Sequence, residues 1–282
     1  MPEGDIVWRT GRLLDRALAG KSLTRCEFRV PALATTDLTG STVTEAISRG
    51  KHLLIRFDNG WTLHSHLRME GSWRIFADGR RWVGGPTYEI RAVLGVPGTT
   101  AVGYRLGVLE LIRTDREPDV VGHLGPDLLG PDWDVAEAVR RLRSDPDRAI
   151  GEALLDQRNL AGIGTVYRAE ILFLQGINPR TPVREVGDLE RVCERVRQLM
   201  IMNRSGYEQN TTGDRRPGRG HWVYGRGGRD CRRCGTAIMM EQFGPEGQER
   251  ISYWCPHCQP LRPAQSRQQP DSGKAPGAGP GC

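Results

Sequence analysis

The sequence predicts an α+β multidomain protein, in which an N-terminal helix and a β-sandwich precede a helical domain and a small metal-bound β-hairpin. Short segments rich in β-branched and aromatic residues fill positions 22–113, at a spacing typical of a β-sandwich. Helical patterns replace them from about 134 to 202. Two Cys-x2-Cys pairs follow within 231–258 and predict the hairpin.

The N-terminal region begins with a predicted helix from residue 4 to about 18. Gly20 ends a pattern of apolar residues at helical spacing, which are Val7, Leu13, Leu14, Ala17 and Leu18. Strands are then predicted at 53–57, 61–64, 73–75, 88–94 and 108–112. Turn signals separate them at 58–60, 78–79 and 96–98. We therefore interpret the first 128 residues as one domain that consists of an N-terminal helix and a β-sandwich.

A segment rich in Gly, Pro and Asp at 122–132 predicts a domain boundary. Helices are expected beyond it at about 134–143, 150–155, 165–175 and 187–202. The chain is accordingly divided into residues 1–128, a helical domain at 129–220, a metal ribbon at 221–260 and a tail at 261–282. The tail is rich in Gln, Pro, Gly and Ser and is predicted to be disordered.

The composition predicts a polyanionic partner and an intracellular protein. The formal net charge is +6 and the pI is near 9.1. No apolar run approaches a membrane span, and the charged N-terminus is no secretory signal, so no membrane association is expected. The chain has three lysines, at 21, 51 and 274, against thirty-seven arginines. We therefore interpret Lys51, between Gly50 and His52, as a position that needs a titratable amine.

The two cysteine pairs predict a metal site. Their C-x2-C-x20-C-x2-C spacing is typical of one tetrahedral zinc ion held by Cys231, Cys234, Cys255 and Cys258. Four protein ligands fill the coordination sphere, so the zinc is predicted to be structural. It would stabilise a hairpin too small for its own core. The arginine-rich residues before it, with eight arginines and three acids between 203 and 234, favour nucleic acid over protein as its partner.

The chain begins with a candidate nucleophile. Removal of Met1 ahead of the small residue Pro2 would free a secondary amine, and such an α-amino group is partly unprotonated near neutral pH. A secondary amine that attacks an aldehyde carbon forms an iminium, which promotes elimination at the neighbouring carbon. Glu3 is one residue away as a proton donor. The alternative is a frayed terminus without a function.

Two further segments are candidates for DNA contact. Residues 154–170 are interpreted as helix, glycine turn and helix, where Thr165 would cap the second helix and its bare amides would bind a phosphate. An ordinary helical hairpin is the alternative. Arg68 and Met69 leave a strand before Gly71 and suit a wedge that enters a base stack, whereas the alternative places Met69 in the core.

Six motifs occur here in the order in which they occur in a known family. They are Met1-Pro2-Glu3-Gly4, Gly50-Lys51-His52, His66-Leu67-Arg68-Met69-Glu70-Gly71, Leu124-Gly125-Pro126-Asp127, the turn motif at 154–174, and Trp254-Cys255-Pro256-His257-Cys258-Gln259. Over about residues 2–260 the sequence resembles bacterial formamidopyrimidine-DNA glycosylases and endonuclease VIII. The Pro-Glu-Gly start is closer to the endonuclease VIII branch.

The resemblance implies a bifunctional DNA glycosylase and abasic-site lyase, with a helix–two-turn–helix in its helical domain. Pro2 would attack C1′ of the damaged nucleotide, and Glu3 would be the acid that helps to open the sugar. Lys51 would donate a proton and contact phosphate during β-elimination. Arg250, on the zinc hairpin, would serve δ-elimination and hold phosphate.

The resemblance also implies how DNA is bound. Arg68 and Met69 align with the loop that fills the gap left by the flipped base. Further DNA contacts are predicted at His123, Asn159 and Thr165. Damaged DNA is the expected partner of a monomeric protein in the bacterial cytosol or nucleoid.

Three departures from the family pattern bear on the substrate. Ile6 stands where many relatives carry glutamate, and this loss alters lesion recognition or moves the role of the glutamate to nearby Asp5. Thr165 replaces the asparagine of the usual Gly-x-Gly-Asn and weakens or changes one phosphate contact. Residues 107–116 lack the pattern of glycosylases that favour oxidised purines, which favours oxidised pyrimidines as substrates.

Two other functions stay open at this point. A catalytically weak protein that senses lesions or single strands could use the same scaffold, and the departures at Ile6 and Thr165 favour it. Retention of Pro2, Glu3, Lys51 and Arg250 together argues against it, because a binding protein needs no terminal amine. A zinc-ribbon protein of translation or transcription would explain the cysteines but not the first 200 residues.

Overall fold

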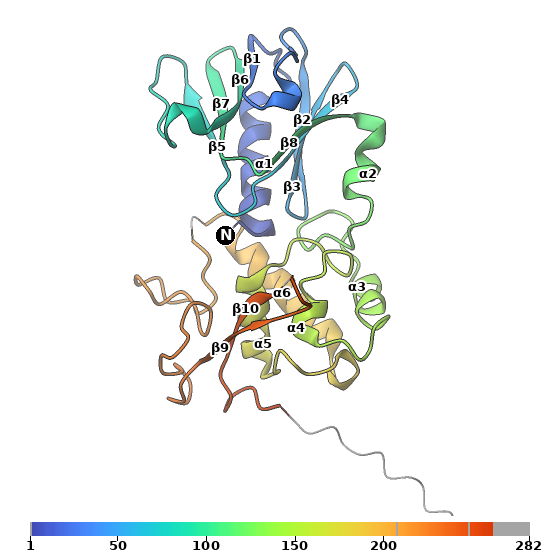
Figure 1. The fold of residues 1–282 in the computed structure, drawn as a ribbon, viewed down its shortest axis with the longest axis vertical. Coiled ribbons are helices and arrows are strands. Elements are labelled where there is room, and N and C mark those ends of the chain that lie inside the picture. The colour runs from blue at the N-terminus through green and yellow to red at the C-terminus, as the bar shows by residue number, and fades with distance from the viewer. Residues whose placement is uncertain (1, 207, 248, 262–282) are drawn as a thin grey trace, which may run out of the picture.

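The computed structural model describes residues 2–206, 208–247 and 249–261. The described chain forms an elongated molecule in two parts stacked along its long axis (Figure 1). The upper part holds the first helix and two β-sheets, and the lower part holds most of the other helices and the C-terminal hairpin. An α+β architecture of sandwich, helices and hairpin is therefore confirmed.

The sandwich consists of two four-stranded antiparallel sheets. One sheet has the order β1-β6-β7-β5, with bounds Arg25–Phe28, Ile90–Val96, Thr99–Tyr104 and Ser72–Ala77. The other has the order β2-β3-β4-β8, with bounds Val43–Arg49, His52–Phe57, Trp61–His66 and Val108–Arg113. Two short 3-10 helices, Pro31–Leu33 and Thr87–Glu89, lie in its connections.

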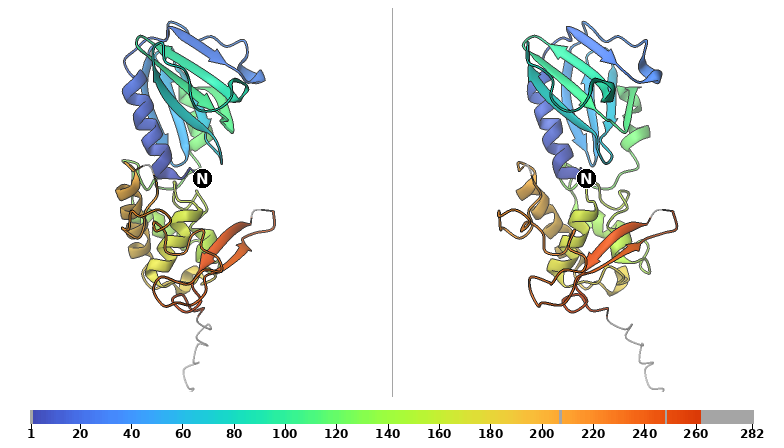
Figure 2. Two further views of the ribbon diagram at one scale, coloured as in Figure 1. Left: turned by 90° about the vertical axis from the view of Figure 1, so that its left-hand side faces the viewer. Right: turned by 60° about the vertical axis from the view of Figure 1, so that its left-hand side comes forward.

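Helix α1 (Gly4–Leu18) is the amphipathic helix that the periodicity predicts. Its buried residues Val7, Leu14 and Leu18 join a core with the inward side chains of both sheets. The helix runs along the sandwich, and its first turn is at the junction with the lower part (Figure 2). The start of the chain is thereby held where the two parts meet.

The lower part is helical. Its helices are α3 (Val135–Leu142), α4 (Ile150–Ala153), α5 (Thr165–Gln175) and α6 (Leu189–Asn203), with a 3-10 turn at Val183–Glu185. Their apolar faces form a second core that contains Leu128, Tyr167, Leu172, Val196 and Met200. A 3-10 turn (Thr114–Arg116) and α2 (Glu117–Val121) lead from the sandwich into this part.

The C-terminal hairpin packs on α5. Strand β9 (Met239–Phe243) pairs with β10 (Arg250–Trp254), and a small third core joins Phe173 of α5 to residues of the ribbon. Glu170 of α5 is buried and accepts the amides of residues 222–224 at 2.8–2.9 Å. This carboxylate fixes the loop that leads to the first cysteine pair.

The sequence-based prediction locates most elements but not all of them. The N-terminal helix, five strands and four helices of the lower part are confirmed. Strands β1, β2 and β7 and helix α2 were not predicted, because their polar residues and glycines weaken the period-2 or helical pattern. The predicted tail beyond 261 lies outside the described residues. Within the described chain, no helix has the length and apolarity to cross a membrane.

Candidate active site

The start of α1 meets the start of α5 at the junction of the two parts. The Gly4 amide donates to the Gly162 carbonyl at 2.8 Å. The Glu3 side chain is 0% exposed, and its carboxylate accepts the amides of Gly164 at 2.8 Å and Val166 at 2.7 Å. A Cβ at Gly164 would lie 2.4 Å from Cδ of Glu3, so only glycine fits there. The Glu3 carboxyl group is thus bound at the N-terminus of α5.

This arrangement corrects the phosphate site expected at the same helix N-terminus. The amides that were to bind DNA phosphate donate instead to the protein's own carboxylate, with Tyr167 contributing a longer bond of 3.4 Å. Thr165 is buried, so little of its side chain is open to DNA in this structure. The expectation of bare amides at α5 is wrong, because the sequence does not show that Glu3 folds onto them.

Burial shifts the pKa values of Glu3 and Lys51 in opposite directions. Burial raises the pKa of Glu3, against the opposing effects of Lys51 and of the Val166 amide. Burial lowers the pKa of Lys51, and nearby Arg250 lowers it further while Glu3 opposes both. Glu3 therefore keeps its proton to a higher pH than an exposed glutamate does, and Lys51 loses its proton at a lower pH than an exposed lysine does. Such shifts are typical of groups that transfer protons.

The β2–β3 turn holds Lys51 against the lower part. Gly50 adopts φ +57°, and its amide donates to Oδ2 of the buried Asp127 at 2.8 Å. A Cβ on Gly50 would approach Cβ of Ala161 to 3.0 Å. Beside it, Arg49 pairs with Asp132 at 2.6 Å. The glycine is required both by its backbone conformation and by this close approach.

Asp127 is therefore expected to position Lys51. In Asp127→Ala the buried amides of Gly50 and Leu129 lose their acceptor, which costs about 1–3 kcal/mol of unfolding free energy. Urea unfolding measures this cost. Asp132→Ala is the matched control, because its side chain is 49% exposed and a surface ion pair contributes about 0–1 kcal/mol. Equal losses in both variants would contradict the positioning role of Asp127.

Two arginines add positive charge around Glu3. Arg250 begins β10, is exposed, and lies within electrostatic reach of Lys51. Arg168 of α5 is fully buried and donates from Nη2 to the Ile251 carbonyl at 2.7 Å. Its Nε and Nη1 have no hydrogen-bond partner among the described residues, and burial lowers its pKa to about 10. The sequence analysis missed Arg168, although an arginine between Tyr167 and Ala169 in a predicted helix is a usable signal.

Asp5, the candidate to replace the missing glutamate, takes part in an internal hydrogen-bond network. It is buried and accepts hydrogen bonds from Oη of Tyr167 at 2.8 Å and from Nε2 of Gln209 at 3.0 Å. Burial raises its pKa, against these two bonds. The network joins the first turn of α1 to α5 and to the segment after α6. A role of Asp5 in lesion recognition stays a prediction.

The predicted wedge is at the surface. Met69 is 66% exposed, so the alternative that placed it in the core is wrong. Arg68 is exposed with φ +56°, and its side chain packs over Gly107, where a Cβ would lie 2.1 Å from Cγ of Arg68. An exposed unbranched side chain beside a guanidinium is compatible with insertion between bases.

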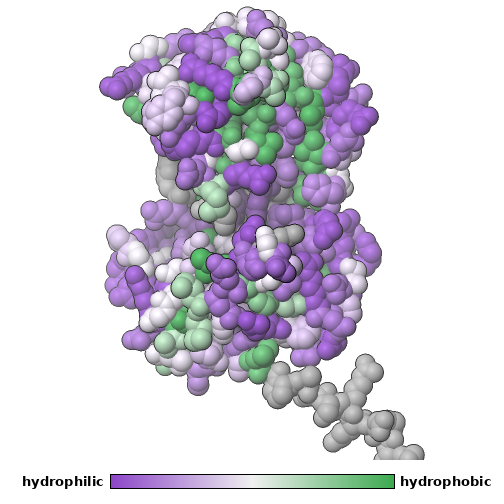
Figure 3. All heavy atoms as spheres, in the orientation of Figure 1, coloured by the Kyte–Doolittle hydropathy of each residue, from purple (hydrophilic) through white to green (hydrophobic). Residues whose placement is uncertain are grey.

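The other predicted DNA contacts differ in accessibility. His123 is exposed in the link between the two parts. Asn159 is half-buried, and its amide donates to the Ala153 carbonyl at 2.9 Å. Their roles in DNA binding stay predictions. In the view of Figure 3, hydrophilic residues gather around the junction, and hydrophobic residues are visible on the upper part.

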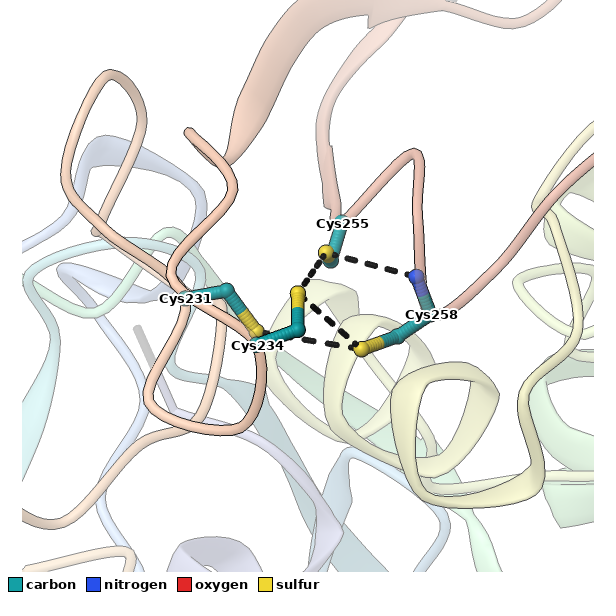
Figure 4. A group of neighbouring side chains, drawn as sticks. All are labelled: Cys231, Cys234, Cys255 and Cys258. Carbon is teal, nitrogen blue, oxygen red and sulfur yellow. Dashed lines mark hydrogen bonds between the residues drawn. The ribbon is translucent and has the colours of Figure 1, made fainter.

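The four cysteines converge as their spacing predicts. Their Sγ atoms all lie within 4.8 Å of one another, with Cys234 at 3.5 Å from both Cys255 and Cys258 (Figure 4). Cys231 lies 4.0 Å from Cys258. A tetrahedron with zinc–sulfur bonds of about 2.3 Å has sulfur atoms about 3.8 Å apart, so the cluster has the dimensions of a metal site. None of these four cysteines forms a disulfide.

Comparisons with known proteins agree with this geometry. The Formamidopyrimidine-DNA glycosylase N-terminal domain matches residues 1–101, and the Formamidopyrimidine-DNA glycosylase H2TH domain matches residues 124–210. "Probable endonuclease 8 2" of Streptomyces coelicolor is 55% identical over 92% of this chain and 94% of its own. "DNA-(apurinic or apyrimidinic site) lyase Nei2" of Mycolicibacterium smegmatis is 50% identical, over 92% and 99% respectively.

The fold comparison reaches the same family. Lactococcus lactis formamidopyrimidine-DNA glycosylase, solved with DNA containing an abasic site, superposes with a TM-score of 0.76. The match covers 92% of this chain and 100% of that one at 24% identity, so it shows the shared fold. Sequence and fold agree, and the chain belongs to the formamidopyrimidine-DNA glycosylase family as an enzyme of its endonuclease 8 branch.

Proposed function

We propose that this chain is a base-excision repair enzyme that removes a damaged base and then cleaves the DNA strand through a covalent bond to Pro2. The observation that carries the proposal is the contact between the chain start and α5, where buried Glu3 lies within electrostatic reach of Lys51. The amine of Pro2, freed of Met1, attacks C1′ and the base leaves. The ring-opened sugar is then joined to Pro2 as an iminium.

The other charged residues near Pro2 can assist ring opening of the sugar and the two eliminations that follow. Protonated Glu3 can donate to the sugar oxygen as the ring opens. Loss of the C2′ proton expels the 3′ phosphate, and Lys51 can take part in this proton transfer because burial lowers its pKa. A second elimination expels the 5′ phosphate, leaving a gap flanked by phosphates. Arg250 and Arg168 would offset the phosphate charge.

We propose zinc as the metal of the cysteine cluster. Four thiolates at tetrahedral spacing fit zinc and leave no coordination position for a substrate, so the ion would be structural. The cluster lies next to the β9–β10 hairpin, whose first β10 residue is Arg250. Zinc would therefore fix the position of this arginine relative to the other charged groups.

We propose oxidised pyrimidines in DNA as the substrates of a monomeric enzyme. The curated relatives at 55% and 50% identity bear endonuclease 8 and abasic-site lyase names. The Lactococcus lactis glycosylase has also been solved with DNA containing an oxidised pyrimidine, at a TM-score of 0.76 and 25% identity. Extrusion of a base from the duplex costs a few kcal/mol, and this cost is smaller for a damaged pair. Exposed Met69 and Arg68 would fill the space that the extruded base leaves.

Borohydride trapping tests the proposal. Purified protein that lacks Met1 by mass spectrometry is incubated with an oligonucleotide containing one abasic site, and the mixture is reduced. An adduct mapped to Pro2, together with strand cleavage to a 3′-phosphate, is expected. A panel of oxidised pyrimidine and purine lesions then defines the substrate. Binding without adduct or cleavage would instead favour a protein that only senses lesions.

Glu3→Gln is expected to separate base removal from cleavage at a ready abasic site. The amide cannot donate a strong acid proton, so base excision should fall about 10²–10⁴-fold. Its NH₂ group would also face an α5 amide, which costs about 1–3 kcal/mol of unfolding free energy. Single-turnover assays with lesion and abasic substrates measure the first effect, and thermal unfolding measures the second. Equal slowing on both substrates would contradict an acid role in base removal.

A further inference from the structure

A loop rich in arginine lies between α6 and the first cysteine pair, and the proposed function uses none of its side chains. We call residues 210–230 the arginine loop. It begins beside the candidate active site, because the preceding Gln209 donates to Asp5 of α1 at 3.0 Å. It ends just before Cys231 of the metal cluster. In Figure 1 the segment after α6, drawn in orange, lies along one side of the lower part, below the junction.

Hydrogen bonds within the loop and from its neighbour Arg232 hold the loop in one conformation. The Thr211 amide donates to the Gly220 carbonyl at 2.8 Å and closes the loop at its base. Arg232 donates from Nη2 to the Gly218 carbonyl at 2.8 Å and from Nε to the His221 carbonyl at 3.1 Å. A loop that is already ordered loses little conformational entropy when it binds a partner.

The five arginines of the loop divide into two groups. Arg226 donates to two backbone carbonyls at 2.6 and 2.7 Å, and Arg216 is paired with Asp214 at 2.6 Å. The other three are exposed, and their guanidinium groups have no hydrogen bond or ion pair with the described residues: Arg215, Arg219 and Arg229. Each of these three offers five N–H donors to a partner.

Positive charge accumulates in the loop. Five arginines and two aspartates give residues 210–230 a formal charge of +3. Burial lowers the pKa of Arg226, and nearby Arg232 and Arg229 lower it further. The Asp214 carboxylate is already bound by Arg216, which lowers the pKa of this acid to about 2. The charge of the exposed arginines is therefore available to attract a polyanion.

The chemistry of the three exposed guanidinium groups fits a phosphate backbone. A guanidinium is planar and always charged, and it binds phosphate oxygens with two parallel hydrogen bonds. Contacts to phosphates carry no sequence information, so such a surface binds damaged and undamaged DNA alike. The loop begins at the first turn of α1, where the damaged nucleotide would bind, so the DNA next to that nucleotide is within its reach.

We propose that Arg215, Arg219 and Arg229 bind the phosphate backbone of duplex DNA beside the damaged nucleotide, independently of base sequence. The position of that nucleotide is taken from the proposed function, on which this inference rests. Arg216, Arg226 and Arg232 shape the loop that presents the three side chains. The arginine loop would thus hold the enzyme on undamaged DNA while it searches for a lesion.

The salt dependence of binding to an undamaged duplex tests this proposal. Each phosphate contact contributes about 0.9 to the slope of log K against log salt concentration, so loss of three contacts should reduce the slope by about 2.7. The variant for this test combines Arg215→Gln, Arg219→Gln and Arg229→Gln, which remove charge and leave the bonds that order the loop. It should bind undamaged duplex more weakly than wild type at low salt, with a difference that narrows as salt rises. Fluorescence anisotropy over a salt titration measures both effects.

The matched control removes three charges from exposed arginines elsewhere on the sandwich. It combines Arg16→Gln, in the last turn of α1, with Arg80→Gln and Arg81→Gln, in the loop after β5. This control should keep the wild-type slope, and thermal unfolding should show that both triple variants are folded. A wild-type slope in the arginine-loop variant, or an equal loss of slope in the control, would overturn the proposal.

The same proteins distinguish failure of this inference from failure of the Pro2 mechanism. Borohydride trapping on an abasic duplex tests the covalent chemistry, whereas anisotropy with undamaged duplex involves no reaction. Absence of an adduct in wild type, with the difference in slope retained, would refute the Pro2 mechanism and support the arginine loop as a DNA-binding surface. A normal adduct in wild type, with equal slopes in wild type and the arginine-loop variant, would refute the loop's role alone.

Discussion

Pro2→Leu is expected to abolish the borohydride-trapped adduct and to reduce strand cleavage at an abasic site by about 10³-fold or more, as loss of a nucleophile does in covalent catalysis. A bulky second residue retains Met1, which displaces the α-amino group by one residue and makes it a primary amine. The adjacent Gly4 amide is bonded to Gly162, and the Glu3 carboxylate is bonded to α5. The first residues are therefore held too firmly for the displaced α-amino group to return to the position that the Pro2 amine occupies.

Pro2→Ala is the matched comparison, because its small second residue allows Met1 to be removed. The amine then stays in position but is primary, and its iminium can lose the N–H proton. We expect an adduct to be trapped. Elimination should be about tenfold slower than with proline, because loss of the N–H proton converts part of the iminium to a neutral imine, which is a weaker electron acceptor. Gel-resolved single-turnover kinetics, with mass spectrometry of the N-terminus, measure both variants. Undiminished trapping in Pro2→Leu would show that another amine is the nucleophile.

The sequence predicts those parts of the site that depend on local patterns. The metal ligands follow from the cysteine spacing, and α1 follows from apolar periodicity, because both signals lie within short stretches. The exposure of Met69 also agrees with the predicted wedge. Pro2, Lys51 and Arg250 were proposed from residue type and family resemblance, and their catalytic roles await experiment.

The sequence could not predict hydrogen bonds between residues that are far apart along the chain. The carboxylate of Glu3 binds amides more than 160 positions away, and Asp127 binds the Gly50 amide across the two parts. Nothing local to α5 indicates that Glu3 occupies its N-terminus, so the expectation of bare amides there is wrong, while the DNA contact of Thr165 stays a prediction. Strand register likewise brings His64 within 2.8 Å of His52 and within 2.7 Å of Glu110, which lie on the two neighbouring strands. Periodicity predicts strands without fixing which residues face each other.

Metal removal is expected to disorganise the hairpin and to abolish the second elimination while the sandwich stays folded. Structural zinc contributes about 10–16 kcal/mol of apparent binding free energy in small peptides, far more than the third core can supply. The sandwich core and the helical core lie apart from the cysteines, so they should persist. Chelation with a chromophoric readout of released metal, followed by limited proteolysis around 239–254 and an abasic-site assay, measures the change.

Arg250→Ala shows whether the metal acts through this arginine. The variant keeps all four cysteines and the β9–β10 pairing but removes one guanidinium. If zinc serves to position Arg250, the chelated protein and Arg250→Ala should share the same defect in the second elimination, while the metal-free protein alone becomes sensitive to protease. The hairpin also contacts α5 through Arg168 and the Ile251 carbonyl, so metal loss should weaken DNA binding further. Full cleavage after verified metal loss would mean that the hairpin keeps its position without the ion, and the placement of Arg250 in the reaction would then be wrong.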